Sequence, residues 1–375
     1  MANFSLSRRS PMGILWEKQK RIPRLLMLLI FLAIAVGGTG LYSAAGGAFY
    51  PWAGRHLIRF CLFLPILLFL AVIPLKTIFQ WSYVAHFGVI ILLVIVEIMG
   101  HIGMGAQRWL ALGSFVLQPS ELCKITLILA LARYCHHQDY KNMGRIPVLI
   151  PPILMMLTPI ALVLLQPNLG TATILGLVGL FILFLAGLRL WKIALGAGAV
   201  GFIAPIVWEH LHDYQKRRVT TFMHPEDDPL GAGYHISQSK IALGAGGING
   251  RGFLQGSQSH LNFLPEKQTD FIFTLMGEEW GLKGTIFILA LYGLMVLAGY
   301  IIAFRCRHQF GRLVALGLSM NLFLYLFINT GMVMGLMPVV GIPLPLLSYG
   351  GTSMLAVMIG FGLLCNMRVH GEEKL

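Results

Sequence analysis

Three clusters of polar residues interrupt an otherwise apolar sequence, and they carry the side chains that can do chemistry. The polar members of the first cluster are Gln107, Arg108, Trp109, Gln118, Ser120, Glu121 and Lys124. If a helix begins near Ser120, then Ser120, Glu121 and Lys124 are three or four residues apart and share one sector of it. Ionisable groups at membrane depth are costly and mark functional cavities. The alternative is that a Glu121–Lys124 pair only locks the helix.

The second cluster lies where a polar loop enters a long apolar run, and its polar members are Glu266, Lys267, Gln268, Thr269 and Asp270. Thr269 is predicted to be the N-cap of the following helix. Asp270 then falls in the first turn, where the helix dipole favours a carboxylate. A carboxylate in this place can act as a general base, or it can be a capping residue and nothing more. Further along this run, Glu278 and Glu279 face either the interior or the interface.

The third cluster, residues 338–353, combines three prolines and three glycines with Ser348, Tyr349 and Gly350. This composition prevents a regular helix, yet the stretch is too apolar for an ordinary loop. Non-helical backbone at membrane depth is tolerated where it is buried or lines a cavity. The alternative is a purely structural re-entrant turn.

The composition indicates a membrane protein. Of the 375 residues, 57% are hydrophobic and 11% are charged, against roughly a quarter charged in a soluble domain. The net charge of +13 could suggest nucleic acid, but basic cytoplasmic loops and an anionic lipid substrate explain it better, so no nucleic-acid partner is expected. Apolar runs long enough to cross a bilayer recur along the chain, which predicts a single domain over residues 1–375.

The predicted fold class is all-α, a polytopic bundle of about ten transmembrane helices. The helices are expected at residues 25–45, 57–75, 84–99, 120–134, 146–165, 169–188, 193–208, 271–304, 313–337 and 346–367. The distribution of Lys and Arg predicts a multi-pass membrane protein with both termini in the cytoplasm. The basic N-terminal stretch is interpreted as the flank of a retained first helix, because the apolar run that follows is too long for a signal peptide.

A long segment, residues 209–270, separates the seventh and eighth helices and is predicted to be a large loop outside the cytoplasm. Its aromatic residues argue against a disordered linker, and its glycines indicate turns and close backbone approaches. Neither GxGxxG nor GxxxxGK[ST] occurs in it, so a nucleotide site is not expected. The histidines and five cysteines form no metal-ligand spacing, so no metal site is predicted and no cofactor is certain, with a divalent cation left open.

Five motifs resemble the SEDS family in order and spacing: QRWLALGSFVLQPSELCK, LLQPNLGTA, DPLGAGYHISQSKIALGAGGINGRGF, FLPEKQTDFIF and GIPLPLLSYGG. The resemblance covers essentially the full chain and is greater to the rod-elongation branch than to the division branch. It implies a ten-helix peptidoglycan glycosyltransferase that polymerises lipid II on the outer face of the cytoplasmic membrane. The implied partners are a class B penicillin-binding protein, which supplies transpeptidation, and other membrane proteins of the elongation complex.

The resemblance also implies roles for individual residues. The essential aspartate of the family corresponds to Asp270. The positions implied to bind substrate are Arg108, Trp109, Gln118, Ser120, Glu121, Lys124, Lys240, Glu266, Lys267, Ser348, Tyr349 and Gly350.

The implied reaction requires a sugar hydroxyl to attack an anomeric carbon while a diphosphate leaves. Asp270 is expected to accept the hydroxyl proton. The cations expected to offset the diphosphate charge are Arg108, Lys124, Lys240 and Lys267. One base without a covalent intermediate fits the family's inversion of the anomeric centre. The alternatives are a lipid II flippase, disfavoured because the charges gather at one end of the helices, and a scaffold for a penicillin-binding protein, which does not explain charges at membrane depth.

Overall fold

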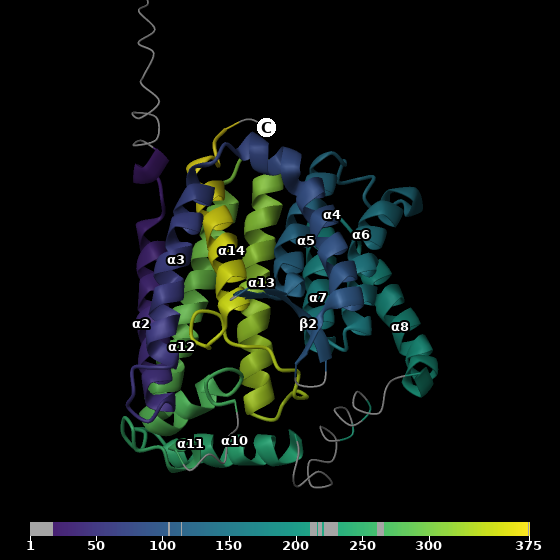
Figure 1. The fold of residues 1–375 in the computed structure, drawn as a ribbon. Coiled ribbons are helices and arrows are strands. Elements are labelled where there is room, and N and C mark those ends of the chain that lie inside the picture. Colours follow the sequence, from purple (N-terminus) through teal and green to yellow (C-terminus); the bar gives the residue numbers. More distant parts are fainter. Residues whose placement is uncertain are drawn as a thin grey trace, which may run out of the picture.

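The computed structural model describes residues 18–103, 106–113, 115–210, 216, 220, 232–260, 266–373 and 375. Within these residues, ten helices run between the two ends of a bundle (Figure 1), and each corresponds to one of the ten helices expected from the sequence. They are α2 (Arg24–Ala44), α3 (Trp52–Val72), α4 (Leu75–Met99), α5 (Pro119–His136), α6 (Ile146–Leu165), α7 (Leu169–Leu185), α8 (Leu190–His210), α12 (Ile272–Arg305), α13 (Gln309–Val333) and α14 (Gly351–Val369). The predicted all-α fold class is confirmed.

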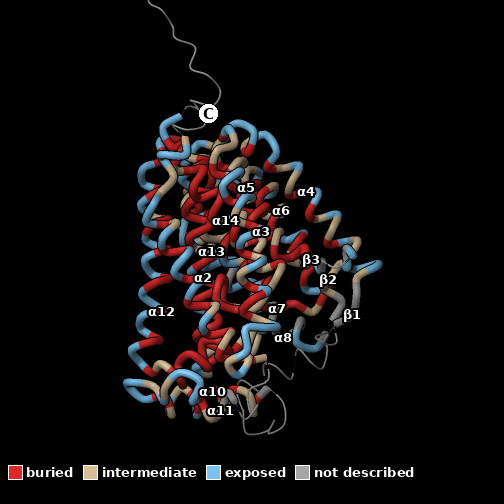
Figure 2. Tube along the Cα trace, turned by 60° about the vertical axis from the view of Figure 1, so that its left-hand side comes forward, coloured by how far each residue is buried: buried red, intermediate tan, exposed pale blue. Residues whose placement is uncertain are grey.

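The helices differ in how deeply they lie in the bundle. Seven of them are long and apolar enough to cross a membrane, and α7 is a shorter apolar helix. In α13 and α14, 78% of the most apolar stretch is buried, against 28% in α3, α4 and α6. Helices α13 and α14 therefore form the centre, while the outer helices turn exposed faces outward (Figure 2). Large exposed apolar residues on those faces, such as Leu28, Phe69 and Phe87, suit a lipid environment.

The described part of the long segment between α8 and α12 contains two helices that the sequence did not predict, α10 (Ala232–Gly246) and the short α11 (Ser257–His260). Figure 1 shows α10 lying across the end of the bundle opposite the C-terminus. The remaining part of this segment lies largely outside the described residues, as do Arg8 and Arg9 of the N-terminal basic stretch. A small antiparallel sheet of β1 (His101–Gly103), β2 (Ala106–Leu112) and β3 (Phe115–Leu117) also went unpredicted.

Helix α12 breaks at Gly281, whose φ of 65° lies in the left-handed region. The backbone groups near this break bond to the loop that follows α10: the amide of Leu282 donates to the Gly247 carbonyl (2.8 Å), and the amide of Gly252 donates to the Glu279 carbonyl (3.1 Å). A side chain at Gly250 would begin 2.0 Å from that same carbonyl oxygen. The prediction that glycines in this segment mark close backbone approaches is confirmed.

The predicted start of the last helix is wrong. Helix α14 begins at Gly351 rather than at residue 346, because Leu346 has a φ of 66° and cannot lie in a right-handed helix. The amide of Ser348 bonds to the Leu344 carbonyl in a turn at 2.9 Å. The third cluster thus stays non-helical up to α14, as its prolines and glycines indicate.

Candidate active site

The three polar clusters meet at one cavity of about 440 Å³, at the end of the bundle from which α5, α7, α12 and α14 begin. Its lining includes Arg59, Arg108, Trp109, Gln118, Glu121, Asn168, Thr171, Glu266, Thr269, Asp270, Gly341, Tyr349, Gly350, Thr352 and Ser353. Residues from all three clusters therefore line the same cavity.

Arg108, at the middle of β2, is held by the chain between α6 and α7. Its Nε donates to the carbonyl of Gln166 at 3.0 Å, and one terminal nitrogen donates to the carbonyl of Pro167. Next to this contact, Asn168 caps α7 by accepting a hydrogen bond from the amide of Thr171 at 3.2 Å. These contacts fix the plane of the guanidinium at the cavity wall.

Asp270 lies in a turn before α12, and this position corrects the capping prediction. The N-cap of α12 is Phe271, so Thr269 is not the cap and Asp270 lies outside the first helical turn. The Thr269 hydroxyl instead donates to Glu266, whose φ of 56° bends the chain back. Because the turn is closed by Glu266, the carboxylate of Asp270 lies at the cavity and not against the helix terminus.

Asn329, a fully buried residue of α13, positions the Asp270 backbone. Its side-chain amide donates to the carbonyl of Asp270 at 2.9 Å and to the carbonyl of Ile342 at 2.7 Å. A side chain at Gly341 would begin 3.3 Å from Oδ2 of Asp270, so the carboxylate lies close over this glycine. Asn329 therefore joins the second cluster to the third.

Ser348 and Tyr349 hold the same turn from the other side. The Ser348 hydroxyl donates to the Thr269 carbonyl at 2.6 Å and accepts from the Leu344 amide at 2.8 Å. The Tyr349 amide donates to the Gln268 carbonyl at 2.8 Å. Ser348 is thus engaged with backbone, whereas the Tyr349 side chain lines the cavity.

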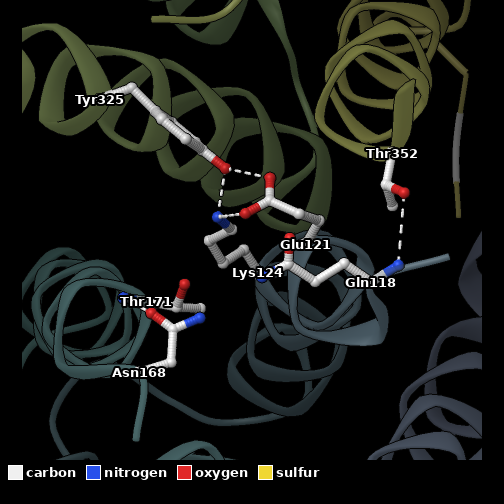
Figure 3. A network of polar contacts seen from close by, with 7 residues as sticks. All are labelled: Gln118, Glu121, Lys124, Asn168, Thr171, Tyr325 and Thr352. Carbon is white, nitrogen blue, oxygen red and sulfur yellow. Dashed lines mark hydrogen bonds and ion pairs between the residues drawn. The ribbon is translucent and has the colours of Figure 1, made fainter. Parts of the chain in front are cut away.

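Glu121 and Lys124 form a buried ion pair together with Tyr325 of α13 (Figure 3). The Lys124 ammonium lies 2.6 Å from Oε1 of Glu121 and also donates to the Tyr325 hydroxyl, which donates to Oε2 of Glu121 at 2.5 Å. Lys124 is 2% exposed and Glu121 is 5% exposed, but only Glu121 borders the cavity. The predicted shared sector is confirmed for Glu121 and Lys124, and the pair links the cavity wall to α13.

Arg59 of α3 is a cavity residue that sequence reasoning missed as a site residue. Its guanidinium carbon lies 4.5 Å from the ring centroid of Tyr349, and it packs beside Gly351. Its Nη1 is buried with no hydrogen-bond partner among the described residues. The available signal in the sequence was an arginine within an apolar helix.

Other expected site residues lie away from the cavity lining. Ser120 is buried, and its hydroxyl has no hydrogen-bond partner in the described part of the chain. Lys240 is exposed on α10, where its side chain lies against Gly335. Lys267 is buried in the turn before α12, and burial lowers the pKa of its ammonium group. Among the described residues no group of three or more His, Cys, Asp or Glu side chains is placed to hold a metal ion.

Glu278 and Glu279 both face the interior, near the break in α12. Glu278 accepts a hydrogen bond from the amide of Gln258 at 2.8 Å, and Glu279 accepts one from the Ser43 hydroxyl of α2. The two carboxylates therefore join α12 to α2 and α11, which is a structural role outside the cavity.

The fold and cavity together define a polytopic membrane protein with a carboxylate and two arginines at one polar site. The model of the FtsW, RodA and SpoVE family of cell cycle proteins matches residues 22–373, and the chain belongs to this family. The resemblance indicated by the five sequence motifs is thereby confirmed.

Individual relatives agree with this assignment. The chain is 44% identical over 365 residues to peptidoglycan glycosyltransferase MrdB of Escherichia coli K12, covering 96% of each. It is similar to a chain of a peptidoglycan synthase complex that coordinates polymerization and crosslinking, with a TM-score of 0.82, 30% identity and coverage of 94% and 99%. It is also similar to rod shape determining protein RodA of Thermus thermophilus, with a TM-score of 0.70, 26% identity and coverage of 94% and 98%.

Proposed function

We propose that this chain is a peptidoglycan glycosyltransferase that polymerises lipid II during cell-wall elongation. The observation that carries the proposal is the shared cavity of Asp270, Arg59 and Arg108, in which a carboxylate and two guanidinium groups line the same space. Relatives that match nearly the whole chain carry the same activity in their names.

The reaction needs one proton acceptor and charge compensation for the leaving group. The acceptor sugar hydroxyl attacks the anomeric carbon of the lipid-linked sugar, and its proton passes to the carboxylate of Asp270. As the bond from that carbon to the diphosphate oxygen breaks, its electron pair stays on the diphosphate. Arg59 and Arg108 offset this charge, and a planar guanidinium suits two-point contact with phosphate oxygens. Direct displacement by one base inverts the anomeric centre.

Lys124 contributes indirectly in this scheme. Its ammonium is buried against Glu121 and Tyr325, and it lines no part of the cavity. We assign it to positioning Glu121, while Lys240 and Lys267 are left as contacts for the remainder of a large substrate. Trp109, Gln118, Glu266 and Gly350 remain proposed substrate contacts because they line the cavity.

The lipid tail has a candidate location next to the cavity. An apolar groove of about 440 Å³ lies between α3, α4, α5 and α14, and Leu122 and Ile125 of α5 line it. Gln118 and Glu121 of the same helix line the polar cavity. A polyprenyl chain in the groove would thus leave its diphosphate near the arginines.

The proposal extends to placement and partners. Both described ends of the chain lie at the bundle end opposite α10 (Figure 1), which fits cytoplasmic termini and a cavity facing the periplasm. Residues 1–375 would act as one domain, with 209–270 as its periplasmic segment. A class B penicillin-binding protein would crosslink the glycan, within the elongation complex.

The test replaces Asp270 with asparagine, which keeps the size of the side chain but has negligible basicity. Purified Asp270→Asn protein, with its partner, should lose lipid II polymerisation while its thermal melting and partner pull-down stay unchanged. Asp139→Asn is a matched control because Asp139 is exposed in the turn after α5. Near-normal glycan synthesis by folded Asp270→Asn protein would exclude Asp270 as the general base. Movement of lipid II across vesicle membranes without polymerisation would favour the flippase.

A further inference from the structure

A second hollow lies at the end of the bundle opposite the polar cavity. It has a volume of about 710 Å³ and is formed by the start of α2, the end of α12 and the end of α14. Its charged lining residues are Lys20, Arg21, Arg24, Arg305, Arg368 and Glu372. Five basic side chains and one carboxylate thus share one cleft, here termed the basic cleft.

Topology alone accounts for basic residues at this end of the bundle, but not for their convergence. Cytoplasmic loops are enriched in Lys and Arg without needing to form a site. Here Arg24, Arg305 and Arg368 come from three helices that are distant in sequence, and they border one concave space. Since like charges gathered in one cleft repel each other, an anion bound there would be stabilised by all of them.

The walls of the basic cleft are apolar, and this indicates the kind of anion. Leu26 and Ile302 form buried wall, while Leu25 is 58% exposed and Ile301 is 42% exposed at its edge. The exposed apolar surface continues along α2 and α12 through Leu28, Leu294 and Leu297. A small hydrophilic anion gains no binding energy from such a surface, whereas acyl chains are stabilised by burying apolar area against it.

We propose that the basic cleft binds the phosphate headgroup of an anionic phospholipid, whose acyl chains lie along α2 and α12. The arginine guanidinium groups can contact phosphate oxygens in pairs, and basic pockets between transmembrane helices on the cytoplasmic side bind such headgroups. The volume falls within the range of small-ligand sites, about 300–1,000 Å³. Because the cleft lies at the other end of the bundle from Asp270, this proposal does not depend on the proposed reaction.

The test measures lipid binding to the full-length protein in detergent by native mass spectrometry. Phosphatidylglycerol, diphosphatidylglycerol and phosphatidylcholine are titrated in parallel, and inorganic phosphate is added as a competitor. The anionic lipids should bind more tightly than phosphatidylcholine. Each of Arg24→Gln, Arg305→Gln and Arg368→Gln should weaken anionic lipid binding about fivefold.

A control variant removes three charges from the same end of the bundle, against one charge in each cleft variant. Lys141, Arg145 and Arg189 are exposed there and lie outside the basic cleft, so Lys141→Gln/Arg145→Gln/Arg189→Gln should bind lipid as the wild type does. Arg305→Lys, which keeps the charge, should lose less than Arg305→Gln. Thermal melting of each single variant verifies that it is folded.

Three results would overturn the proposal. Equal binding of phosphatidylcholine would show that the basic cleft does not distinguish lipid headgroups by their net charge. If the control triple variant and the cleft variants lose equal affinity for anionic lipid, binding depends on the overall positive charge of this end of the bundle and not on the basic cleft. Displacement of the lipid by inorganic phosphate at similar concentration would indicate a free-phosphate site without any contribution from acyl chains.

Discussion

Replacing Lys124 with methionine should lower the free energy of unfolding by about 3 kcal/mol, because it leaves the Glu121 carboxylate buried without its cation. Breaking a buried pair typically costs about 3–5 kcal/mol. The lower end applies here, since the Tyr325 hydroxyl still donates to Glu121 at 2.5 Å and Glu121 borders the cavity. The folding equilibrium should therefore shift by about a hundredfold.

The double variant Glu121→Gln/Lys124→Met separates the two interpretations of this pair. It leaves no buried charge at similar volume, so its stability should return to within about 1 kcal/mol of the wild type. If the pair only locked α5 to α13, polymerisation would return as well. We expect polymerisation by the double variant to stay about tenfold below the wild-type rate, because Glu121 lines the cavity wall. This corresponds to a loss of about 1.4 kcal/mol in transition-state stabilisation.

Both quantities can be measured on the same preparations. Reversible unfolding in mixed micelles gives the free energies, and lipid II polymerisation gives the activities. A Lys124→Met protein as stable as the wild type would refute the buried-charge reasoning. If the double variant is stable and fully active, the Glu121–Lys124 pair has only a structural role.

Further outcomes are expected at other positions. Asn329→Asp puts a carboxylate oxygen against two backbone carbonyls, so kcat should fall about tenfold while KM changes little, and unchanged kcat would contradict its positioning role. Cysteine at Ile248, which is exposed after α10, should react with an impermeant maleimide from the periplasmic side, while cysteine at Lys141 should not; the reverse pattern would invert the proposed topology. His308 accepts from the Gly311 amide at the start of α13, and burial lowers the His308 pKa below its ordinary value. The cap is thus complete above about pH 6.5 and is lost as pH falls through the lowered pKa, at a cost of about 1 kcal/mol. His308→Asn should remove this pH dependence of the melting temperature. If the melting temperature still falls at acid pH as in the wild type, another group is responsible.

Apolar length predicts most of the helices, although α4 begins at Leu75 rather than at the predicted residue 84, and α5 is short and carries Glu121 and Lys124. Helix α6 matches its predicted bounds at both ends, where Arg145 and Gln166 flank a run that is apolar except for Thr158. Tertiary contacts decide what the sequence does not predict. Helix α10 has little apolar character of its own, and it is fixed in part by Ser239, whose hydroxyl donates to the Val333 carbonyl at 2.8 Å.

The site could be predicted where several polar residues stand together, and it was missed where one stands alone. The clusters around Glu121 and Asp270 indicate a cavity because ionisable groups at membrane depth are energetically costly and usually mark functional sites. Asn329 gives no such signal, since a single amide in an apolar helix has many structural uses. Its role depends on two carbonyls that only the folded chain brings within 2.9 Å of it.

The third cluster acts mainly by holding the backbone of the turn before α12, and this decides between the two interpretations of its prolines and glycines. Ser348 and Tyr349 bond to carbonyls of the turn that holds Asp270, and Asn329 ties that turn to Ile342. A carboxylate held from three sides needs little reorganisation before accepting a proton, which is how rigid supports contribute to catalysis. The stretch is therefore both a structural turn and part of the site, because its rigidity is what places the proposed base.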